Sequence, residues 1–60
     1  MSLSSKRESI LVVDDAPDTL EMLQRNLMSE GYQVYTAPGV GEAVRILEST
    51  TVDLVITDYK

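Results

Sequence analysis

Three aspartates are the residues of this sequence with the clearest potential for chemistry. Asp14 and Asp15 are adjacent and follow one apolar run, and Asp58 follows another. Two unit charges about 5 Å apart repel by roughly 3 kcal/mol at an effective dielectric constant near 20, so three clustered carboxylates need protons or a cation. An oxygen-only cluster suits Mg²⁺, which accepts few protein ligands when waters and a phosphate complete its shell. A carboxylate beside such an ion can act as a nucleophile toward a phosphoryl group.

The composition removes several other chemistries. The sequence contains no Cys and no His, which excludes disulfides, thiolate metal sites and imidazole catalysis. Ten acidic residues against five basic ones give a net charge of −5, which argues against direct nucleic-acid binding. The longest apolar run, Ile10–Val13, is far shorter than the ~20 residues of a membrane span, so no membrane partner is expected. Residues 1–9 lack the apolar core of a secretory signal, and the expected location is the cytoplasm.

The hydrophobic pattern alternates between strand and helix. Two runs, Ile10–Val13 and Leu54–Thr57, are apolar on both faces, as in buried parallel strands, whereas Tyr32–Ala37 alternates like an edge strand. Leucines recur at helical spacing after Pro17, which fits a first helical turn, and Gly31 suits a C-terminal cap. The predicted elements are therefore a strand at 10–13, a helix at 17–30, a strand at 32–37, a helix at 41–49 and a strand at 53–57.

This order predicts an α/β fold with parallel strands, because each connection is long enough for a right-handed crossover. Residues 1–9 are predicted to be a flexible arm and residues 10–60 one domain. The two doubly apolar strands suggest that the first strand lies between the other two. The carboxyl ends of parallel strands share one edge of the sheet, so Asp14, Asp15 and Asp58 should meet at a topological switch point.

Each acid also has a purely structural interpretation. Asp15 is placed to be the N-cap of the first helix, Asp14 to be a solvated loop residue and Asp58 to form a turn. Asp53 reads as a loop acid in front of a strand. Met22 and Met28 are predicted to lie in or near the core. The residues alone therefore leave a carboxylate metal site as a hypothesis beside these simpler roles.

A resemblance adds to this hypothesis. The segment Ile10–Asp15, followed later by Asp53–Asp58, resembles the bacterial response-regulator receiver domain. The helix around Leu20–Leu23, the turn Gly31–Val34 and the segment Glu42–Val44 also match that family. The resemblance covers residues 10–60 without a gap, and an acidic pair combined with a strand-end Asp is a specific combination.

The resemblance implies a flavodoxin-like, doubly wound sheet with strand order 2-1-3-4-5. It implies that Asp58 accepts a phosphoryl group from a phosphohistidine of a sensor histidine kinase. Asp15 and Asp58 would ligate Mg²⁺ directly, Asp14 would act through a metal-bound water, and the main-chain carbonyl of Lys60 would be the third protein ligand. Such a module is not an enzyme, and it acts on a downstream effector domain or protein.

The chain departs from the family in length. Receiver domains continue through a fourth and a fifth strand, with a Ser or Thr after the fourth and a Lys after the fifth that contact the phosphoryl group. The sequence is therefore expected to be the N-terminal β-α-β-α-β half of a receiver domain. Its third strand would then be an exposed edge, and we expect the isolated 60-residue chain to self-associate.

Other classes of function remain open at this point. A Mg²⁺-dependent phosphotransferase or phosphatase fragment would use a similar sheet, although the haloacid-dehalogenase pattern separates its two acids and Asp14 and Asp15 are adjacent. A nucleotide-binding half of a Rossmann fold lacks support. The motif G-x-G-x-x-G is absent after the first strand, and the acids Asp14 and Asp15 in its place would repel a pyrophosphate. An interaction module with structural acids is a further alternative.

Overall fold

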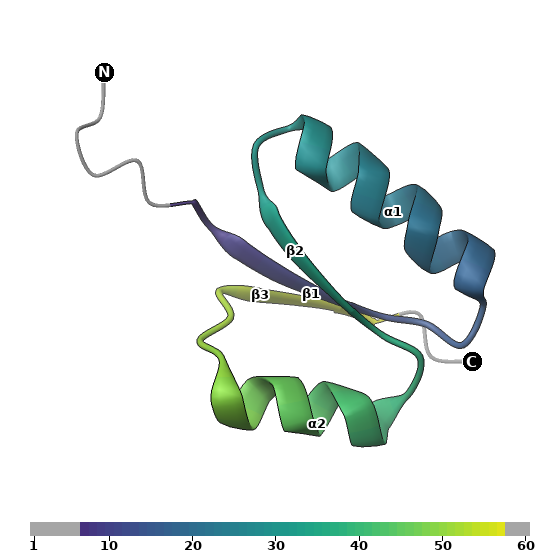
Figure 1. Cartoon of the computed structure of the whole chain (residues 1–60), viewed down its shortest axis with the longest axis vertical. Coiled ribbons are helices and arrows are strands. Elements are labelled where there is room, and N and C mark those ends of the chain that lie inside the picture. The colour runs from purple at the N-terminus through teal and green to yellow at the C-terminus, as the bar shows by residue number, and fades with distance from the viewer. Residues whose placement is uncertain (1–6, 58–60) are drawn as a thin grey trace.

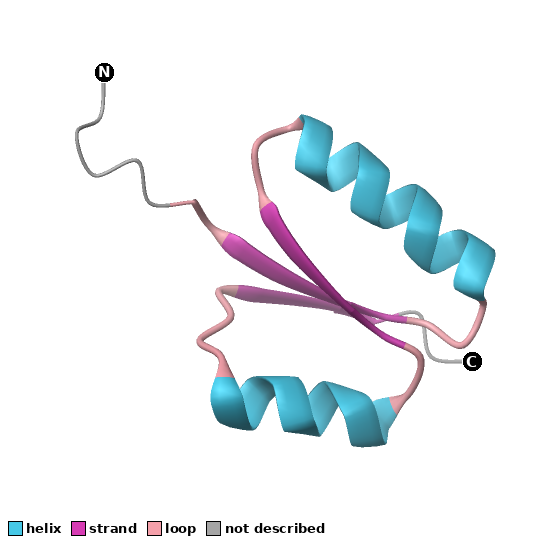
Figure 2. Cartoon of the chain, in the orientation of Figure 1, coloured by secondary structure: helices cyan, strands magenta, loops and turns pink. Residues whose placement is uncertain are grey.

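Five elements alternate along the chain in the predicted order (Figure 2). The computed structural model describes residues 7–57, so the predicted site residues Asp58 and Lys60, and residues 1–6 of the predicted arm, lie outside the described residues. The elements are β1 (Ser9–Val13), α1 (Pro17–Ser29), β2 (Gln33–Ala37), α2 (Val40–Ser49) and β3 (Leu54–Thr57). Each begins or ends within a residue or two of its predicted bounds, and β1 starts one residue early, at Ser9.

The three strands form a parallel sheet in the order β2-β1-β3, which confirms that the first strand is central (Figure 1). Val13, the last residue of β1, lies beside Ala37 of β2 and Thr57 of β3. The carboxyl ends of all three strands therefore share one edge of the sheet. This arrangement confirms the α/β class and corresponds to part of a flavodoxin-like fold.

One helix covers each face of the sheet (Figure 1). Both helices pack against β1 and β2, and among residues 7–57 neither packs against β3. On the α2 side, Leu11 and Val13 form a small core with Ala37 and Ala43. Ile10 and Val12 are buried on the opposite face, because successive strand residues point to opposite sides. The core is thus concentrated on the central strand.

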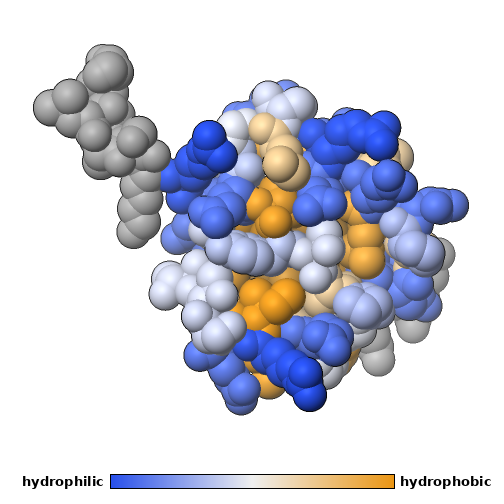
Figure 3. All heavy atoms as spheres, in the orientation of Figure 1, coloured by the Kyte–Doolittle hydropathy of each residue, from blue (hydrophilic) through white to orange (hydrophobic). Residues whose placement is uncertain are grey.

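Both methionines predicted for the core are exposed, at 54 % for Met22 and 55 % for Met28, so that prediction is wrong. At 3.6 residues per turn, Met22 lies on the side of α1 opposite Leu20. Apolar side chains also reach the surface between charged ones on the face drawn in Figure 3. Within residues 7–57, neither helix has the length and hydropathy needed to cross a membrane.

Gly31 ends α1 in the way that the sequence predicted. Its φ of 100° lies in the left-handed region that favours glycine. The Gly31 N–H donates to the Met28 carbonyl at 3.0 Å, and the Tyr32 N–H donates to the Leu27 carbonyl at 3.2 Å. These two bonds form a Schellman motif, which satisfies the last carbonyls of α1 and turns the chain into β2.

Two glycine substitutions should change stability in opposite directions. Gly31→Ala should lower the free energy of unfolding by about 1–2 kcal/mol, because an L side chain disfavours a left-handed backbone. Gly41→Ala, inside α2, should raise it by about 0.5–1 kcal/mol. Neither added Cβ would meet another atom within 4 Å, so backbone conformation alone sets both signs. Urea unfolding of the two variants checks this, and a loss of stability in both would contradict it.

Candidate functional site

The acidic pair lies where the central strand ends. Asp14 follows Val13 directly, and its N–H donates to the Ala37 carbonyl at 3.1 Å, which extends the pairing between β1 and β2 by one residue. Asp14 is 8 % exposed, whereas Asp15 is exposed to solvent. The interpretation of Asp14 as a solvated loop residue is therefore wrong. One carboxylate of the pair is held inside the fold and the other is open to the solution.

The Asp14 side chain is fixed by a local hydrogen bond. Its Oδ1 accepts a hydrogen bond from the Ala16 N–H at 2.9 Å. The N-cap of α1 is Ala16, which makes no side-chain capping bond, so the interpretation of Asp15 as the N-cap is wrong. The physical reason is that Asp14 closes the turn through a bond to the backbone two residues ahead, and Pro17, which lacks an N–H, then opens the helix.

The third strand ends beside the acidic pair. Thr57, the last described residue of β3, pairs in register with Val13, the residue before Asp14. Two of the predicted site residues, Asp14 and Asp15, are therefore described, at the edge of the sheet where they were expected. Within residues 7–57, no group of three Asp, Glu, His or Cys side chains gathers in a way that could hold a metal ion.

The donor set fits a hard cation such as Mg²⁺. Asp14 and Asp15 supply carboxylate oxygens, which are ligands that Mg²⁺ prefers. Asp14 is buried and Asp15 is exposed. The one ion pair found among the described residues, Arg25 with Glu21 at 3.4 Å, lies on the solvent face of α1. Neither acid of the pair is bridged to a basic side chain in that range.

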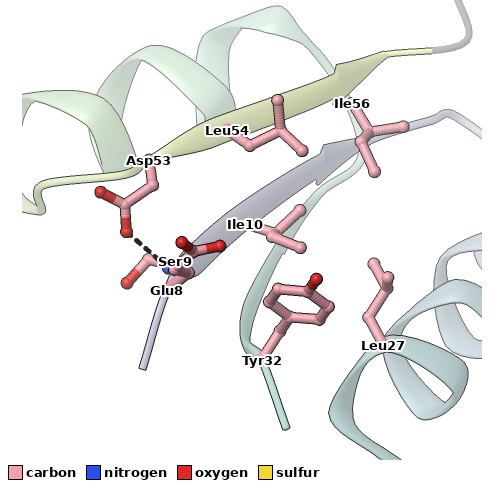
Figure 4. Close-up of a pocket in the computed structure, with 8 residues that line it drawn as sticks. All are labelled: Glu8, Ser9, Ile10, Leu27, Tyr32, Asp53, Leu54 and Ile56. Atoms are coloured by element: carbon pink, nitrogen blue, oxygen red, sulfur yellow. Dashed lines mark hydrogen bonds between the residues drawn. The ribbon is translucent and has the colours of Figure 1, made fainter. Parts of the chain in front are cut away.

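Sequence reasoning missed the role of Asp53. Its Oδ2 accepts a hydrogen bond from the Ser9 N–H at 2.8 Å, and its own N–H donates to the Ser9 carbonyl at 2.9 Å (Figure 4). This pair of bonds joins the amino ends of β1 and β3, at the edge opposite Asp14. No local pattern reveals it, because the two residues are distant in sequence and meet only when the strands pair.

An apolar groove on the surface lies away from the acidic pair. A groove of about 180 Å³ opens between α1 and the amino ends of β1 and β3 (Figure 4). Its walls are mainly apolar, and its lining includes Ile10, Leu27, Tyr32, Leu54 and Ile56. The groove holds no second cluster of acids beyond Glu8 and Asp53 at its rim, so the carboxyl edge remains the candidate site.

Comparison with known proteins identifies similar sequences. Residues 10–60 match the family model of the response regulator receiver domain. The chain is 45 % identical over 58 residues to the transcriptional regulatory protein GlrR of Escherichia coli K12, covering 97 % of the chain and 13 % of GlrR. It is 41 % identical over 51 residues to the regulatory protein PhoP of Bacillus subtilis, named for alkaline phosphatase synthesis, covering 85 % of the chain and 21 % of PhoP.

A third similarity is to a kinase. The sensor histidine kinase TmoS of Ectopseudomonas mendocina is 39 % identical over 54 residues, covering 90 % of the chain and 5 % of TmoS. The chain therefore spans a small part of each of these three relatives. No solved structure gives a significant match.

The bond between Asp14 and Ala16 can be tested with two substitutions at one position. Asp14→Ala and Asp14→Asn both remove the charge, but only Ala removes the oxygen that accepts the Ala16 N–H. We expect Asp14→Ala to be less stable than Asp14→Asn by about 1 kcal/mol. Urea unfolding of the two variants measures the difference, and equal stability would show that the bond contributes nothing.

Proposed function

The chain belongs to the response regulator receiver domain family, and from that membership we propose that it accepts a phosphoryl group on Asp58. The donor in this proposal is the phosphohistidine of a sensor histidine kinase in a two-component system. Receiver domains are signalling modules, and we propose that this chain acts as such a module and not as an enzyme. The family match covers residues 10–60, which include all four predicted site residues.

The observation that carries the proposal is the register of the two strands that precede the acids. Val13 and Thr57 are partners in the parallel pairing of β1 with β3. Asp14 follows the first of these residues in sequence and Asp58 follows the second. Acids that follow paired residues of neighbouring parallel strands leave the sheet at the same edge, so this register supports a shared site.

The proposed division of labour assigns a role to each site residue. The Asp58 carboxylate is the nucleophile: its oxygen forms a bond to phosphorus as the bond from phosphorus to the histidine nitrogen of the donor breaks. Asp15 and Asp58 would ligate Mg²⁺ directly, the Lys60 main-chain carbonyl would be the third protein ligand, and Asp14 would act through a metal-bound water. The chemistry that Mg²⁺ would supply there is neutralisation of charge on the phosphoryl oxygens.

The described geometry supports these roles for the acidic pair. The bond from the Ala16 N–H holds the Asp14 carboxylate in one orientation, which suits a ligand that acts through an ordered water. The exposed Asp15 side chain is open to an ion arriving from solution. Burial of Asp14 beside the strand end excludes part of the solvent, which strengthens the attraction between the pair and a cation.

Partners and location follow from the same proposal. Because GlrR and PhoP are named as regulators of transcription, we propose that phosphorylation is read by an effector domain or an effector protein. The similarity to part of a sensor histidine kinase fits a role in the same kind of signalling. We further propose that the module works in the cytoplasm and does not itself contact nucleic acid, since its net charge is −5.

Incubation of the protein with Mg²⁺ and acetyl phosphate tests the acceptor directly. We expect an alkali-labile acyl phosphate that maps to Asp58, and we expect EDTA to prevent its formation. Asp58→Asn should abolish the label. Asp53→Asn is the matched control, because Asp53 precedes β3 and bonds to Ser9 at the other edge, so this variant should still be labelled.

The outcomes of this experiment separate the candidate functions. Label on Asp58 supports the receiver, whereas turnover of a substrate with label on another residue would support the phosphotransferase or phosphatase alternative. A protein that takes no label at any Mg²⁺ concentration would contradict the proposal. That result would favour the alternative of an interaction module whose acids are structural.

Mg²⁺ should also stabilise the folded chain without any phosphodonor. A ligand that binds only the native state raises the free energy of unfolding by about 1.4 kcal/mol at ten times its dissociation constant. We expect this gain in the native protein and in Asp53→Asn, and its loss in Asp15→Asn. Thermal unfolding with and without Mg²⁺ measures the gain, and an equal response in the Asp15 variant would remove that residue from the ligand set.

A further inference from the structure

β2 forms the edge of the sheet on the side away from β3. The order β2-β1-β3 leaves its outer side without a strand partner among residues 7–57. In the order 2-1-3-4-5 of the receiver family β2 is again the outermost strand, so this edge does not depend on where the sequence ends. Its residues Gln33–Ala37 include no charge and no proline, and all five pair with β1 in continuous register. β2 therefore lacks the usual features that protect an edge strand from pairing.

The backbone groups that β2 turns outward can be assigned from its bonds to β1. The N–H of its first residue, Gln33, donates to the Glu8 carbonyl at 3.0 Å. The carbonyl of its last residue, Ala37, accepts a bond from the residue that follows β1, at 3.1 Å. Alternate residues of a strand bond to the same neighbour, so the second and fourth residues of β2 face the other way. Val34 and Thr36 therefore direct their N–H and C=O groups to the open edge.

We propose that this edge pairs with β2 of a second copy of the chain, antiparallel and about a twofold axis at Tyr35. In that register, Val34 lies opposite Thr36 of the partner subunit, and the two residues exchange two N–H···O=C bonds. The twofold axis produces this pair twice, so every outward backbone group of Val34 and Thr36 is satisfied. The result is one sheet that continues through both copies. The proposal does not depend on phosphoryl transfer.

The neighbouring registers leave backbone groups without partners. With the axis at Thr36, Val34 would face Pro38 of the partner subunit, which has no N–H to donate. With the axis at Val34, Thr36 would face Tyr32 of the partner subunit, whose N–H is already used to close the end of α1. Of these three registers, the one about Tyr35 gives each outward group of both strands a partner.

The helix on one face of this edge carries two charges that suit the arrangement. Both helices pack against β2, one on each face of the sheet (Figure 1). Ala43 of α2 is buried against the sheet. At 3.6 residues per turn and with right-handed crossovers, Glu42 and Arg45 then lie on the side of α2 toward the open edge. Both are exposed, and in the described part of the chain neither forms an ion pair.

The twofold axis brings these opposite charges together. An axis perpendicular to the sheet keeps each face on its own side, so α2 meets α2 of the second copy and the two helices run antiparallel. Glu42 of one copy then approaches Arg45 of the partner subunit, and the axis repeats the pair. This charge complementarity favours a second copy of the chain over an unrelated strand as the occupant of the edge.

The side chains of the paired strands also match. Tyr35, which packs against the small core on the α2 face, meets Tyr35 of the partner subunit as an aromatic cross-strand pair. On the α1 face, Val34 lies beside Thr36 of the partner subunit. Because each copy contributes one short strand and carries a net charge of −5, the dimer should be weak and should form in a concentration-dependent way.

Hydrogen exchange of two backbone amides, followed by NMR, tests the pairing directly. In the monomer the Val34 and Thr36 N–H groups face solvent and should exchange rapidly. As the protein concentration rises, both should become protected at least tenfold, because each then donates to a carbonyl of the second copy. The Tyr35 N–H, which faces β1, is the internal control and should be protected already in the monomer. Sedimentation over the same concentrations should show a monomer that becomes a dimer.

Single cysteines test the register, since the native sequence has none. Tyr35→Cys should form a disulfide-linked dimer with oxidised glutathione, because a non-hydrogen-bonded antiparallel pair has a Cα separation of about 4.5 Å. Val34→Cys should fail to link to itself, because equivalent residues would be more than about 7 Å apart. A mixture of Val34→Cys and Thr36→Cys should give the mixed dimer.

Charge reversal tests the contact between the two copies of α2. Glu42→Arg should weaken the dimer at least tenfold relative to Glu48→Arg, the matched control, which changes the net charge equally on the side of α2 that faces away from the sheet. Arg45→Glu should also weaken the dimer. The double variant Glu42→Arg/Arg45→Glu should restore it, because the opposite charges meet again. Circular dichroism of each variant verifies that it is folded.

Several results would overturn the proposal. Val34 and Thr36 amides that exchange at the same rates at all concentrations would do so. Self-linking of Val34→Cys as efficient as that of Tyr35→Cys would reject the axis at Tyr35. A double charge variant that dimerises no better than the single variants would reject the twofold contact of α2. Protection of the two amides in a monomer would show that another segment of the same chain takes the edge.

Discussion

The rest of the structure depends on the parallel pairing of β1 with a strand on each side. β1 takes hydrogen bonds from β2 and β3 and packs beneath a helix on each face, so its four apolar residues are all buried. Because the strands are parallel, their carboxyl ends meet at one edge. The position of Asp14 and Asp15 is a direct result of that geometry, because they are the first residues after the central, buried strand.

Much of this arrangement could be predicted from local patterns. The run Ile10–Val13, apolar on both faces, identified the central strand, and Pro17 and Gly31 identified the start and the end of α1. These features could be predicted because each depends only on the conformation or burial of a residue and its neighbours in sequence. The family resemblance, carried by the acidic pair and the later strand-end Asp, agrees with the family match over residues 10–60.

Other features could not be predicted because they depend on contacts distant in sequence or on the exact phase of a helix. The turn before α1 is closed by the Asp14 side chain and not by an N-cap at Asp15. This depends on the residue at which β1 ends, which is Val13. Asp53 is tied to Ser9 only once β1 and β3 have paired. Met22 fitted an apolar pattern but falls on the outer side of α1. The roles of Asp58 and Lys60 rest on the family and on the strand register.

The all-parallel sheet has a consequence for how the chain folds. No two neighbouring strands are joined by a hairpin, so each strand pairing must close a loop that contains a whole helix, and the bond between Ser9 and Asp53 closes the longest of them. High contact order of this kind slows folding relative to a helical protein of equal size. During synthesis β1 emerges before its two neighbours and acquires the second of them, β3, last, so one hydrogen-bonding edge of β1 stays unpaired and open to misassembly until β3 has left the ribosome.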